Sequence, residues 1–491
     1  MRVAPKQPRI SFRWLAIGLV ALFLVLYILP LGHLDLFTPD ETRYAEIPRE
    51  MIASGDWVVP RLNGVRYFEK PVLGYWAHAG SLLLFGENNF AVRLPEALAV
   101  GLAAWLVFVL VARTGRGDRH RAAVAAFVFL TSFEVFALGS GAVLDSLFSF
   151  FVTATIAAFW FATEAPKASL RERGWLVGAG VACGLAFLTK GFLAFAVPGL
   201  VLPAYLAWQR RYLDILRMAW LPALGALAVS LPWSIAIHQR EPDFWNSFFW
   251  NEHVRRFTGS DAQHSTPLWK FWLAALGMFL PWIVLIPSLV PGIRRRSGAD
   301  DPQGRLVRLA LCWLLLPFLL VSLSKGKLVT YILPCFPPFA VLVAFGIEHW
   351  KKWMTWLGLG TAVLFFSAHF AIPKKALVSK TFAPFLEKHA ADITPTTIIL
   401  SDATAVHAIC WQYKRSDVFI LAYSGELTYG LKHDHSERLV SIPDAPAWIA
   451  KHHGRVVLIT RARRYSLLKD RLPEPRSVDR NSPEGYVIVT F

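Results

Sequence analysis

Residues 39–71 read PDETRYAEIPREMIASGDWVVPRLNGVRYFEKP, a highly charged stretch that directly follows an apolar segment. It mixes aromatic residues with acids and bases, among them Asp40, Arg43, Glu69 and Lys70. Ionisable groups next to hydrocarbon are costly and usually functional. The stretch therefore predicts a site at a membrane surface, between a first membrane anchor and the next helix.

The composition of the whole chain also indicates a membrane protein. Of its 491 residues, 55% are hydrophobic, 20 are Trp and 36 are Phe, and the mean hydropathy is +0.42. Soluble globular chains do not have this composition. Apolar runs of about 17 to 25 residues predict a polytopic α-helical protein with about 11 to 13 spans. The runs cover residues 14–32, 90–112, 121–139, 142–163, 175–191, 192–208, 218–237, 269–291, 305–323, 328–347 and 353–372. A shorter apolar piece, 72–85, is read as interfacial or re-entrant, with a true span as the alternative.

The basic loops predict how the chain crosses the membrane. If the N-terminus is cytoplasmic, five basic loops fall on the cytoplasmic side, as the positive-inside rule requires. These loops lie around residues 113–121, 167–173, 210–217, 294–305 and 351–352. The net charge of +17 is then a consequence of topology, and nucleic acid is not an expected partner. The domain within the membrane, 1–372, would place loops 33–89 and 239–268 on the outer face.

The tail, residues 373–491, is predicted to form a small α/β domain on that outer face. Its apolar runs shorten to strand length. Strands are expected at 396–400, 417–421, 455–460 and 486–491, and helices at 403–413 and 445–453. The histidines of the tail are interpreted as solvated surface residues and not as metal ligands. The four cysteines indicate neither a disulfide framework nor a metal site.

The start of the charged stretch has the pattern of a helix N-terminus. Thr38 is expected as the N-cap, with Pro39 at the first helical position and Glu41 completing a capping box. Asp40 has no such structural role. Arg43 lies three residues further along, so it shares a helix face with Asp40 and could pair with it or bind an anion.

Other ionisable residues are predicted to gather on the outer face. Asp145 lies just inside the span 142–163, and Lys190 lies at the junction of two apolar segments. Both positions are costly, which favours function for Asp145, whereas Lys190 could simply snorkel. The predicted cations are Arg43, Lys70, Lys190, Arg255, Arg256, Lys325 and Lys327, with Tyr331 one helical turn beyond Lys327. With a few carboxylates, such a cluster can hold phosphates beside a reacting group.

Five motifs carry a resemblance to a known family. They are DETRYAEIPREMIASGDWVVPRLNGVRYFEKPVLGYW (40–76), FGENNFAVRLPEAL (85–98), LTKGFLA (188–194), NEHVRRF (251–257) and SKGKLVTYILPCFPP (324–338). At these motifs the chain resembles the bacterial lipid A aminoarabinose transferases. Those are GT-C glycosyltransferases of the inner membrane, related to the protein O-mannosyltransferases.

The resemblance implies a reaction and a location. It implies transfer of 4-amino-4-deoxy-L-arabinose from an undecaprenyl-phosphate-linked donor to a phosphate of lipid A. The active site and the tail would be periplasmic, with membrane lipids around the spans, and the anomeric carbon would invert. No nucleotide is needed, because a cationic cluster can stabilise the leaving phosphate. A phosphate acceptor is already ionised near neutral pH, since its second pKa is about 6, so little general-base catalysis is required.

The resemblance also implies roles for particular residues. Asp40 and Asp145 match proposed catalytic acids. Arg43, Lys70 and Lys190 match positions that bind the carrier phosphate, and Tyr331 matches a cavity tyrosine. Glu69 and His253 match positions associated with a structural zinc ion. Two ligands make an incomplete zinc sphere, so the metal is not required.

Two alternatives stay open from the sequence. A related polyprenyl-phosphate-dependent transferase could deliver another sugar, or act on lipid A, a glycan or a protein. A transporter of lipid-linked sugars could share this topology. A transport path should show ionisable groups through the midplane, and the predicted spans are nearly uncharged inside, which argues against transport.

Overall fold

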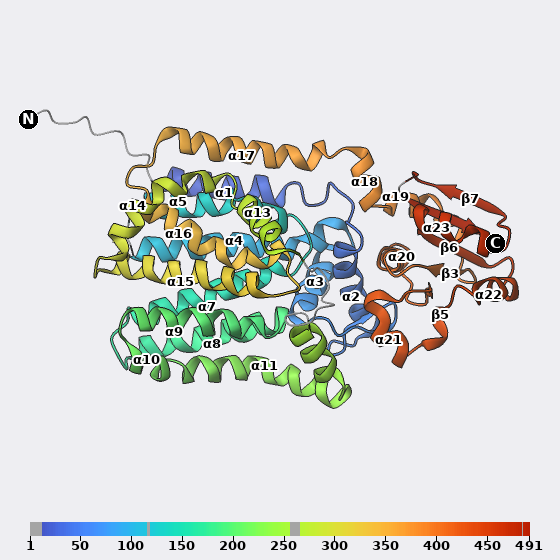
Figure 1. The fold of residues 1–491 in the computed structure, drawn as a ribbon, viewed down its shortest axis with the longest axis horizontal. Helices are drawn as coiled ribbons and strands as arrows, with labels where there is room; N and C mark the ends of the chain where they lie inside the picture. Colours follow the sequence, from blue (N-terminus) through green and yellow to red (C-terminus); the bar gives the residue numbers. More distant parts are fainter. Residues whose placement is uncertain (1–11, 115–117, 256–265, 484) are drawn as a thin grey trace, which may run out of the picture.

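The chain forms a helical bundle with a small α/β domain at one end (Figure 1). The computed structural model describes residues 12–114, 118–255, 266–483 and 485–491. Helices α2 (Asp40–Ser54) and α3 (Leu73–Phe85) lie at the end of the bundle that faces the α/β domain.

Six described helices or helix runs are long and apolar enough to cross a membrane. They are α4 (Asn89–Thr114), α7 (Asp145–Thr163), α10 with α11 (Tyr212–Arg217 and Trp220–Arg240), α15 (Pro302–Leu323), η4 with α16 (Val329–Cys335 and Phe336–Gly346) and α17 (Lys352–Ala371). Two bent helix pairs raise the number to eight if each pair is one span. The chain is therefore a multi-pass membrane protein.

Two of the predicted spans, 121–139 and 269–291, are bent helix pairs. Helix α5 (Arg119–Leu130) meets α6 (Phe133–Gly139) at a bend of 63°, and α13 (Leu268–Met278) meets the run Trp282–Ser297 (η3 and α14) at 91°. At the first bend the Thr131 hydroxyl donates to the Phe127 carbonyl, and such back-bonding bends helices. At the second, Pro281 lacks an N–H group and so cannot continue the helix.

Three further predicted spans are helical but do not meet the same criterion of length and hydropathy. Helices α1 with η1 (Phe12–Phe23 and Leu24–Ile28) and α9 (Leu193–Trp208) are apolar and shorter. Helix α8 (Leu170–Lys190) has 21 residues, with Glu172 in its first turn and Lys190 as its last residue. The count of about 11 to 13 spans stays a prediction.

Helix α8 packs against both α7 and α11, and its approach to α11 is very close. A Cβ atom on Gly180 of α8 would lie 2.3 Å from the Pro222 carbonyl oxygen of α11. No side chain fits there, so the glycine allows the two backbones to approach closely. Asp145 is the first residue of α7, and Lys190 is the last of α8.

Helices α2 (Asp40–Ser54) and α3 (Leu73–Phe85) cover the end of the bundle, joined by a small hairpin of β1 (Arg61–Leu62) and β2 (Val65–Arg66). The hairpin turns at Asn63 and Gly64, whose φ angles are 56° and 72°. Positive φ at both positions is the geometry that an Asn-Gly pair favours. At 13 residues, α3 is about 20 Å long and too short to span a bilayer.

The α/β domain is built on a six-stranded sheet of order β5-β4-β3-β6-β8-β7. Strands β3 (Ile398–Ser401), β4 (Phe419–Leu421), β5 (Leu439–Val440) and β6 (Val456–Arg461) run parallel, and β7 (Ser477–Arg480) and β8 (Tyr486–Thr490) are antiparallel additions. Helices α18 (Lys374–Lys380) and α19 (Ala383–Lys388) lead into it, and α20 (Val406–Tyr413), α21 (Thr428–His433), α22 (Ala445–Lys451) and α23 (Ala462–Leu468) complete it. The four predicted strands are confirmed within two residues. The two-residue β5 and the polar edge strand β7 were missed because neither shows an apolar run.

Candidate active site

Arg43, one turn into α2, lies at the centre of a cluster of carboxylates. Its Nη2 is 3.2 Å from Asp40 Oδ1, and its Nη1 is 3.0 Å from Glu426 Oε1 and 3.7 Å from Glu69 Oε2. Nη1 also donates to the Tyr67 hydroxyl at 3.2 Å. The Arg43 side chain is 10% exposed, whereas that of Asp40 is 69% exposed. The predicted pairing of Asp40 with Arg43 is therefore present, at the mouth of a buried cluster.

Glu426 comes from the α/β domain and was not predicted from the sequence. It lies in η6 (Gly425–Leu427), in the loop that follows β4. The Tyr67 hydroxyl donates to its Oε2 at 3.0 Å, and His407 Nε2 lies 3.7 Å from the same oxygen. Burial alone would raise the pKa of Glu426, but the charge of Arg43, with neighbouring His407 and Tyr67, lowers it to about 2. The carboxylate is ionised at neutral pH.

One signal in the sequence could have pointed to Glu426. In parallel α/β sheets, ligands bind beyond the carboxyl ends of the strands. The residues that follow the predicted strand 417–421 include this acid. Its contact with Arg43 depends on how the α/β domain packs against α2, which no local sequence pattern predicts.

A second cluster joins the ends of α7 and α8. Lys190 Nζ lies 2.5 Å from Asp145 Oδ1 and 4.6 Å from the centre of the Tyr331 ring. The structure thus brings together three residues that the sequence placed far apart.

Tyr44 connects the two clusters. The Arg43 guanidinium carbon lies 5.7 Å from the centre of its ring. Burial raises the pKa of Tyr44; Arg43 opposes this effect, and the carboxylates of Asp145 and Glu69 reinforce it. Carboxylates of both clusters are thus close enough to Tyr44 to act on its hydroxyl.

The remaining predicted cations are placed differently from one another. Lys70 lies beside the first cluster, and its Nζ donates to the Glu69 carbonyl at 3.0 Å. Lys327 is buried and donates to the Ser322 carbonyl at 2.8 Å, which indicates a local structural role. Lys325 is exposed on the same loop.

Three predicted site residues lie in the loop 239–268, which the structure describes only in part. Arg256 lies outside the described residues. The side chains of His253 and Arg255 also lie outside the described part of the structure.

The predicted zinc site stays untested. Glu69 is one of the carboxylates around Arg43, whereas the side chain of its expected partner His253 is not described. Among the described residues there is no group of three or more His, Cys, Asp or Glu side chains that could hold a metal ion. A zinc site needs about four ligands, so the described residues do not make one.

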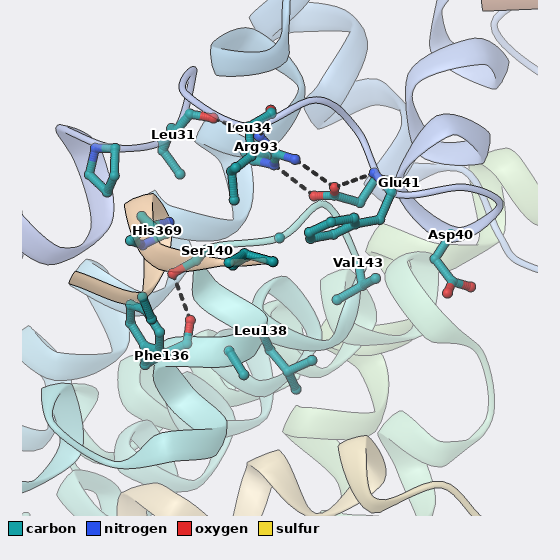
Figure 2. A pocket seen from close by; sticks show the side chains of 16 residues that line it. Leu31, Leu34, Asp40, Glu41, Arg93, Phe136, Leu138, Ser140, Val143 and His369 are labelled. Atoms are coloured by element: carbon teal, nitrogen blue, oxygen red, sulfur yellow. Dashed lines mark hydrogen bonds and ion pairs between the residues drawn. The ribbon is translucent and has the colours of Figure 1, made fainter. Parts of the chain in front are cut away.

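Glu41 anchors the helix start that presents Asp40. Arg93 donates from Nε and Nη2 to the two Glu41 carboxylate oxygens at 2.8 and 2.7 Å, and both side chains are 3% exposed (Figure 2). The backbone N–H groups of Phe37 and Ala142 each donate to Glu41 at 2.8 Å. Glu41 has a structural role, but not the predicted one in a capping box. The predicted Thr38 cap is wrong, since α2 begins at Asp40 after Pro39 and Glu41 accepts from Phe37.

An apolar cavity of about 290 Å³ lies beside Asp40, between the start of α2, the α6–α7 connection and the end of α17. Figure 2 shows Asp40 pointing away from the Glu41–Arg93 pair. The lining residues include Leu31, Leu34, Phe37, Phe136, Leu138, Val143 and His369. An exposed acid thus sits between a charged cluster and an apolar wall.

Comparison with known proteins identifies relatives along the whole chain. The family model of dolichyl-phosphate-mannose-protein mannosyltransferases matches residues 13–248, and that of the arabinosyl transferase ArnT, C-terminal domain, matches residues 377–489. Undecaprenyl phosphate-α-4-amino-4-deoxy-L-arabinose arabinosyl transferases from Shewanella sediminis and Edwardsiella ictaluri are each 37% identical. The alignments cover 94% and 93% of this chain and 95% of each relative.

Solved structures share the fold. ArnT from Cupriavidus metallidurans bound to undecaprenyl phosphate superimposes with a TM-score of 0.83 at 23% identity, covering 98% of both chains. The Archaeoglobus fulgidus oligosaccharyltransferase AglB, in complex with an inhibitory peptide and a dolichol-phosphate, gives a TM-score of 0.55 at 13% identity, covering 92% of this chain and 69% of that one. With the relatives above, these findings confirm the resemblance of the motifs: the chain belongs to the undecaprenyl phosphate-α-4-amino-4-deoxy-L-arabinose arabinosyl transferases, which are polyprenyl-phosphate-sugar-dependent membrane glycosyltransferases.

Proposed function

We propose that the protein transfers 4-amino-4-deoxy-L-arabinose from undecaprenyl phosphate to a phosphate of lipid A, at the periplasmic face of the bacterial inner membrane. The observation that carries this proposal is the pair of charged clusters around Tyr44, at the end of a membrane bundle that matches these transferases over almost its full length. Arg43 and Lys190 are the cations of the two clusters.

In this proposal Arg43, Lys70 and Lys190 bind the carrier phosphate. A guanidinium can hold two phosphate oxygens through parallel N–H groups. In the structure Asp40 binds Nη2 of Arg43 and Glu426 binds Nη1. A phosphate that binds Arg43 must therefore compete with these two carboxylates. The apolar cavity beside Asp40 gives the lipid portion of a substrate a place next to the charged groups.

The reaction breaks the bond between the anomeric carbon and the carrier phosphate oxygen. A lipid A phosphate oxygen forms the new bond to that carbon, and undecaprenyl phosphate leaves with one more negative charge. Lys190 and Arg43 stabilise this developing charge. The acceptor oxygen is already ionised, so Asp40 orients Arg43 and the donor and does not need to remove a proton. No step passes through a metal ion.

The distribution of basic loops supports the proposed orientation. Arg305 pairs with Glu164 at 2.7 Å, and Arg217 pairs with Glu172 at 2.7 Å. These contacts gather basic loops from distant parts of the chain. Figure 1 places α10 and α14 at the end of the bundle away from the α/β domain. The positive-inside rule favours a cytoplasmic location for that end, which supports a periplasmic location for both charged clusters.

The test is mass spectrometry of lipid A from a strain that lacks the gene and from the same strain complemented with it. We expect aminoarabinose-modified lipid A only in the complemented strain. Unmodified lipid A in both strains, or a different sugar on lipid A, would overturn the proposal. A glycosylated periplasmic protein or glycan in place of modified lipid A would instead support the alternative acceptor.

A further inference from the structure

The Arg43 guanidinium is shared by three carboxylates. Asp40, Glu69 and Glu426 all lie within 3.7 Å of its guanidinium. Asp40 is mostly exposed to solvent, and Lys70 lies beside Glu69. Glu426 is 27% exposed, and charges shielded from water are normally paired, so its contact with Arg43 stabilises its charge.

A second observation points to the same place. His407 is 2% exposed, and neither of its ring nitrogens makes a hydrogen bond with any described residue. Its Nε2 lies 3.7 Å from Glu426 Oε2. Arg43 Nε is also buried without a hydrogen-bond partner within the described ranges. Buried polar groups are nearly always satisfied, so these atoms indicate a polar ligand between the α/β domain and α2.

Binding of the donor phosphate would leave Glu426 without its partner. Glu426 holds Arg43 Nη1 at 3.0 Å. When a phosphate takes that N–H group, the carboxylate stays in the site, held by the Tyr67 hydroxyl at 3.0 Å. A buried carboxylate that loses its cation is strongly destabilising. A donor that brings its own positive charge avoids this cost.

We infer that Glu426 binds the protonated 4-amino group of the donor sugar, so that the α/β domain selects an amino sugar over a neutral one. The inference rests on the proposed function, because it assigns the donor to the Arg43 cluster. Such a donor carries one negative phosphodiester and one positive ammonium group. Its phosphate would replace Glu426 on Arg43, and its ammonium would replace Arg43 on Glu426, so every charge keeps a partner.

The position of Glu426 in the fold suits this role. It follows β4 on the side of the sheet where α/β domains present ligand-binding loops. Tyr67, which bonds both Arg43 and Glu426, keeps the phosphate position and the amine position within one sugar's reach of each other.

The test compares the wild type with Glu426→Gln, both purified as the full chain in lipid nanodiscs. Each is assayed with the aminoarabinose donor and with an otherwise identical undecaprenyl phosphate donor carrying neutral L-arabinose. Loss of a buried charge partner should lower the wild-type preference for the amino sugar by at least about thirtyfold. This ratio does not depend on the fraction of folded enzyme. Glu426→Asp should restore part of it.

Binding of undecaprenyl phosphate without sugar provides a second readout. Glu426→Gln removes a competitor for Arg43, so its affinity should be equal to or higher than that of the wild type. The matched control is Glu437→Gln, an exposed glutamate of the same domain that pairs with His435, and it should behave as the wild type in both assays.

If the wild type is active, either of two outcomes would overturn the inference. One is an unchanged preference for the amino sugar in Glu426→Gln, and the other is loss of undecaprenyl phosphate binding, which would make Glu426 a positioning residue for Arg43. A wild type that transfers no aminoarabinose would overturn the proposed function, and the inference with it.

Discussion

Arg43 shares one guanidinium between its own helix and a separate domain. Asp40 binds Nη2, whereas Glu426 and Tyr67 bind Nη1. A lysine could not make these contacts together, because its ammonium is a single point charge and the arginine fork is planar. The fork therefore determines how Asp40 on α2 and Glu426 of the α/β domain are placed relative to each other.

Arg43→Lys should impair donor binding although it keeps the charge. Loss of one charge-assisted hydrogen bond to phosphate costs about 1.5 to 3 kcal/mol. We therefore expect kcat/KM for the donor to fall by about tenfold to a hundredfold or more. The measurement is steady-state transfer with purified enzyme. Lys167→Ala, an exposed cation at the other end of the bundle, is the control and should keep normal kinetics. Normal kinetics in Arg43→Lys would reject the phosphate-binding role.

Asp40→Asn distinguishes an orienting acid from a general base. The variant keeps the size of the side chain but removes its charge and its capacity to accept a proton. If the acceptor is an ionised phosphate, the loss of activity should show little relief above pH 7. A general base acting on a hydroxyl would be worth about a hundredfold to ten-thousandfold, and its loss should be partly relieved at high pH. The measurement is the pH profile of kcat/KM. Strong alkaline rescue would favour a hydroxyl acceptor.

At the scale of the elements, the hairpin between α2 and α3 holds the α/β domain against the bundle. The Asn63 amide donates to the Val418 carbonyl at 2.8 Å and accepts from the Val418 N–H at 2.9 Å. Arg66 adds a bond from Nε to Asp434 Oδ1 at 2.6 Å. These contacts keep the loop that carries Glu426 beside α2.

The sequence predicts the local parts of this arrangement and misses the contacts between domains. Asp40 and Arg43 pair because three residues along a helix define one face, and the Asn-Gly turn at residues 63–64 follows from backbone preferences. Glu426 reaches Arg43 across a separation of almost four hundred residues, and no periodicity encodes that distance. The Thr38 cap failed because Glu41 satisfies the N–H of Phe37 and pairs with Arg93.

Asp402 should stabilise the sheet in a pH-dependent way. Its carboxylate accepts bonds from the Thr404 and Thr460 hydroxyls at 2.5 and 2.6 Å, and from the Thr404 N–H at 2.8 Å. Burial raises its pKa, but these bonds outweigh burial and lower it. The unfolded-state pKa is about 3.9. The stabilisation is therefore complete above that pH, and it is lost as the pH falls through the lower folded-state pKa.

Asp402→Asn tests that contribution. Removing the charge should lower the free energy of opening of β3 and β6 by about 1.5 to 3 kcal/mol near neutral pH. Hydrogen exchange of those strand amides in the full chain measures it. The difference from the wild type should shrink in acid below the folded-state pKa. Asp470→Asn, an exposed acid in the same domain, is the control. Equal protection in Asp402→Asn and the wild type at neutral pH would contradict the prediction.

At the scale of the molecule, the two ends of the bundle differ in charge and in structure. One end carries α2, α3 and the α/β domain, and the other carries α10 and α14 (Figure 1), which border basic loops. Ion pairs join those loops across the chain, such as Arg305 with Glu164 and Arg295 with Glu348. The basic loops are thus packed together at one end of the bundle. The positive-inside rule predicts that this end is cytoplasmic, and one pair of probes can test that orientation.

Cysteine labelling at opposite ends of the bundle should reveal the orientation. The four native cysteines are buried, so a membrane-impermeant maleimide should report mainly introduced sites. Ser466→Cys places an exposed thiol on the α/β domain, and Lys167→Cys places one in a basic loop at the other end. In spheroplasts we expect Ser466→Cys to react at once. Lys167→Cys should react only after the membrane is permeabilised, because the positive-inside rule predicts that the basic loops are cytoplasmic. The cysteine-free exterior of the wild type is the control. The reverse pattern would place both charged clusters in the cytoplasm, out of reach of a periplasmic lipid A phosphate, and would reject the proposed reaction with the topology.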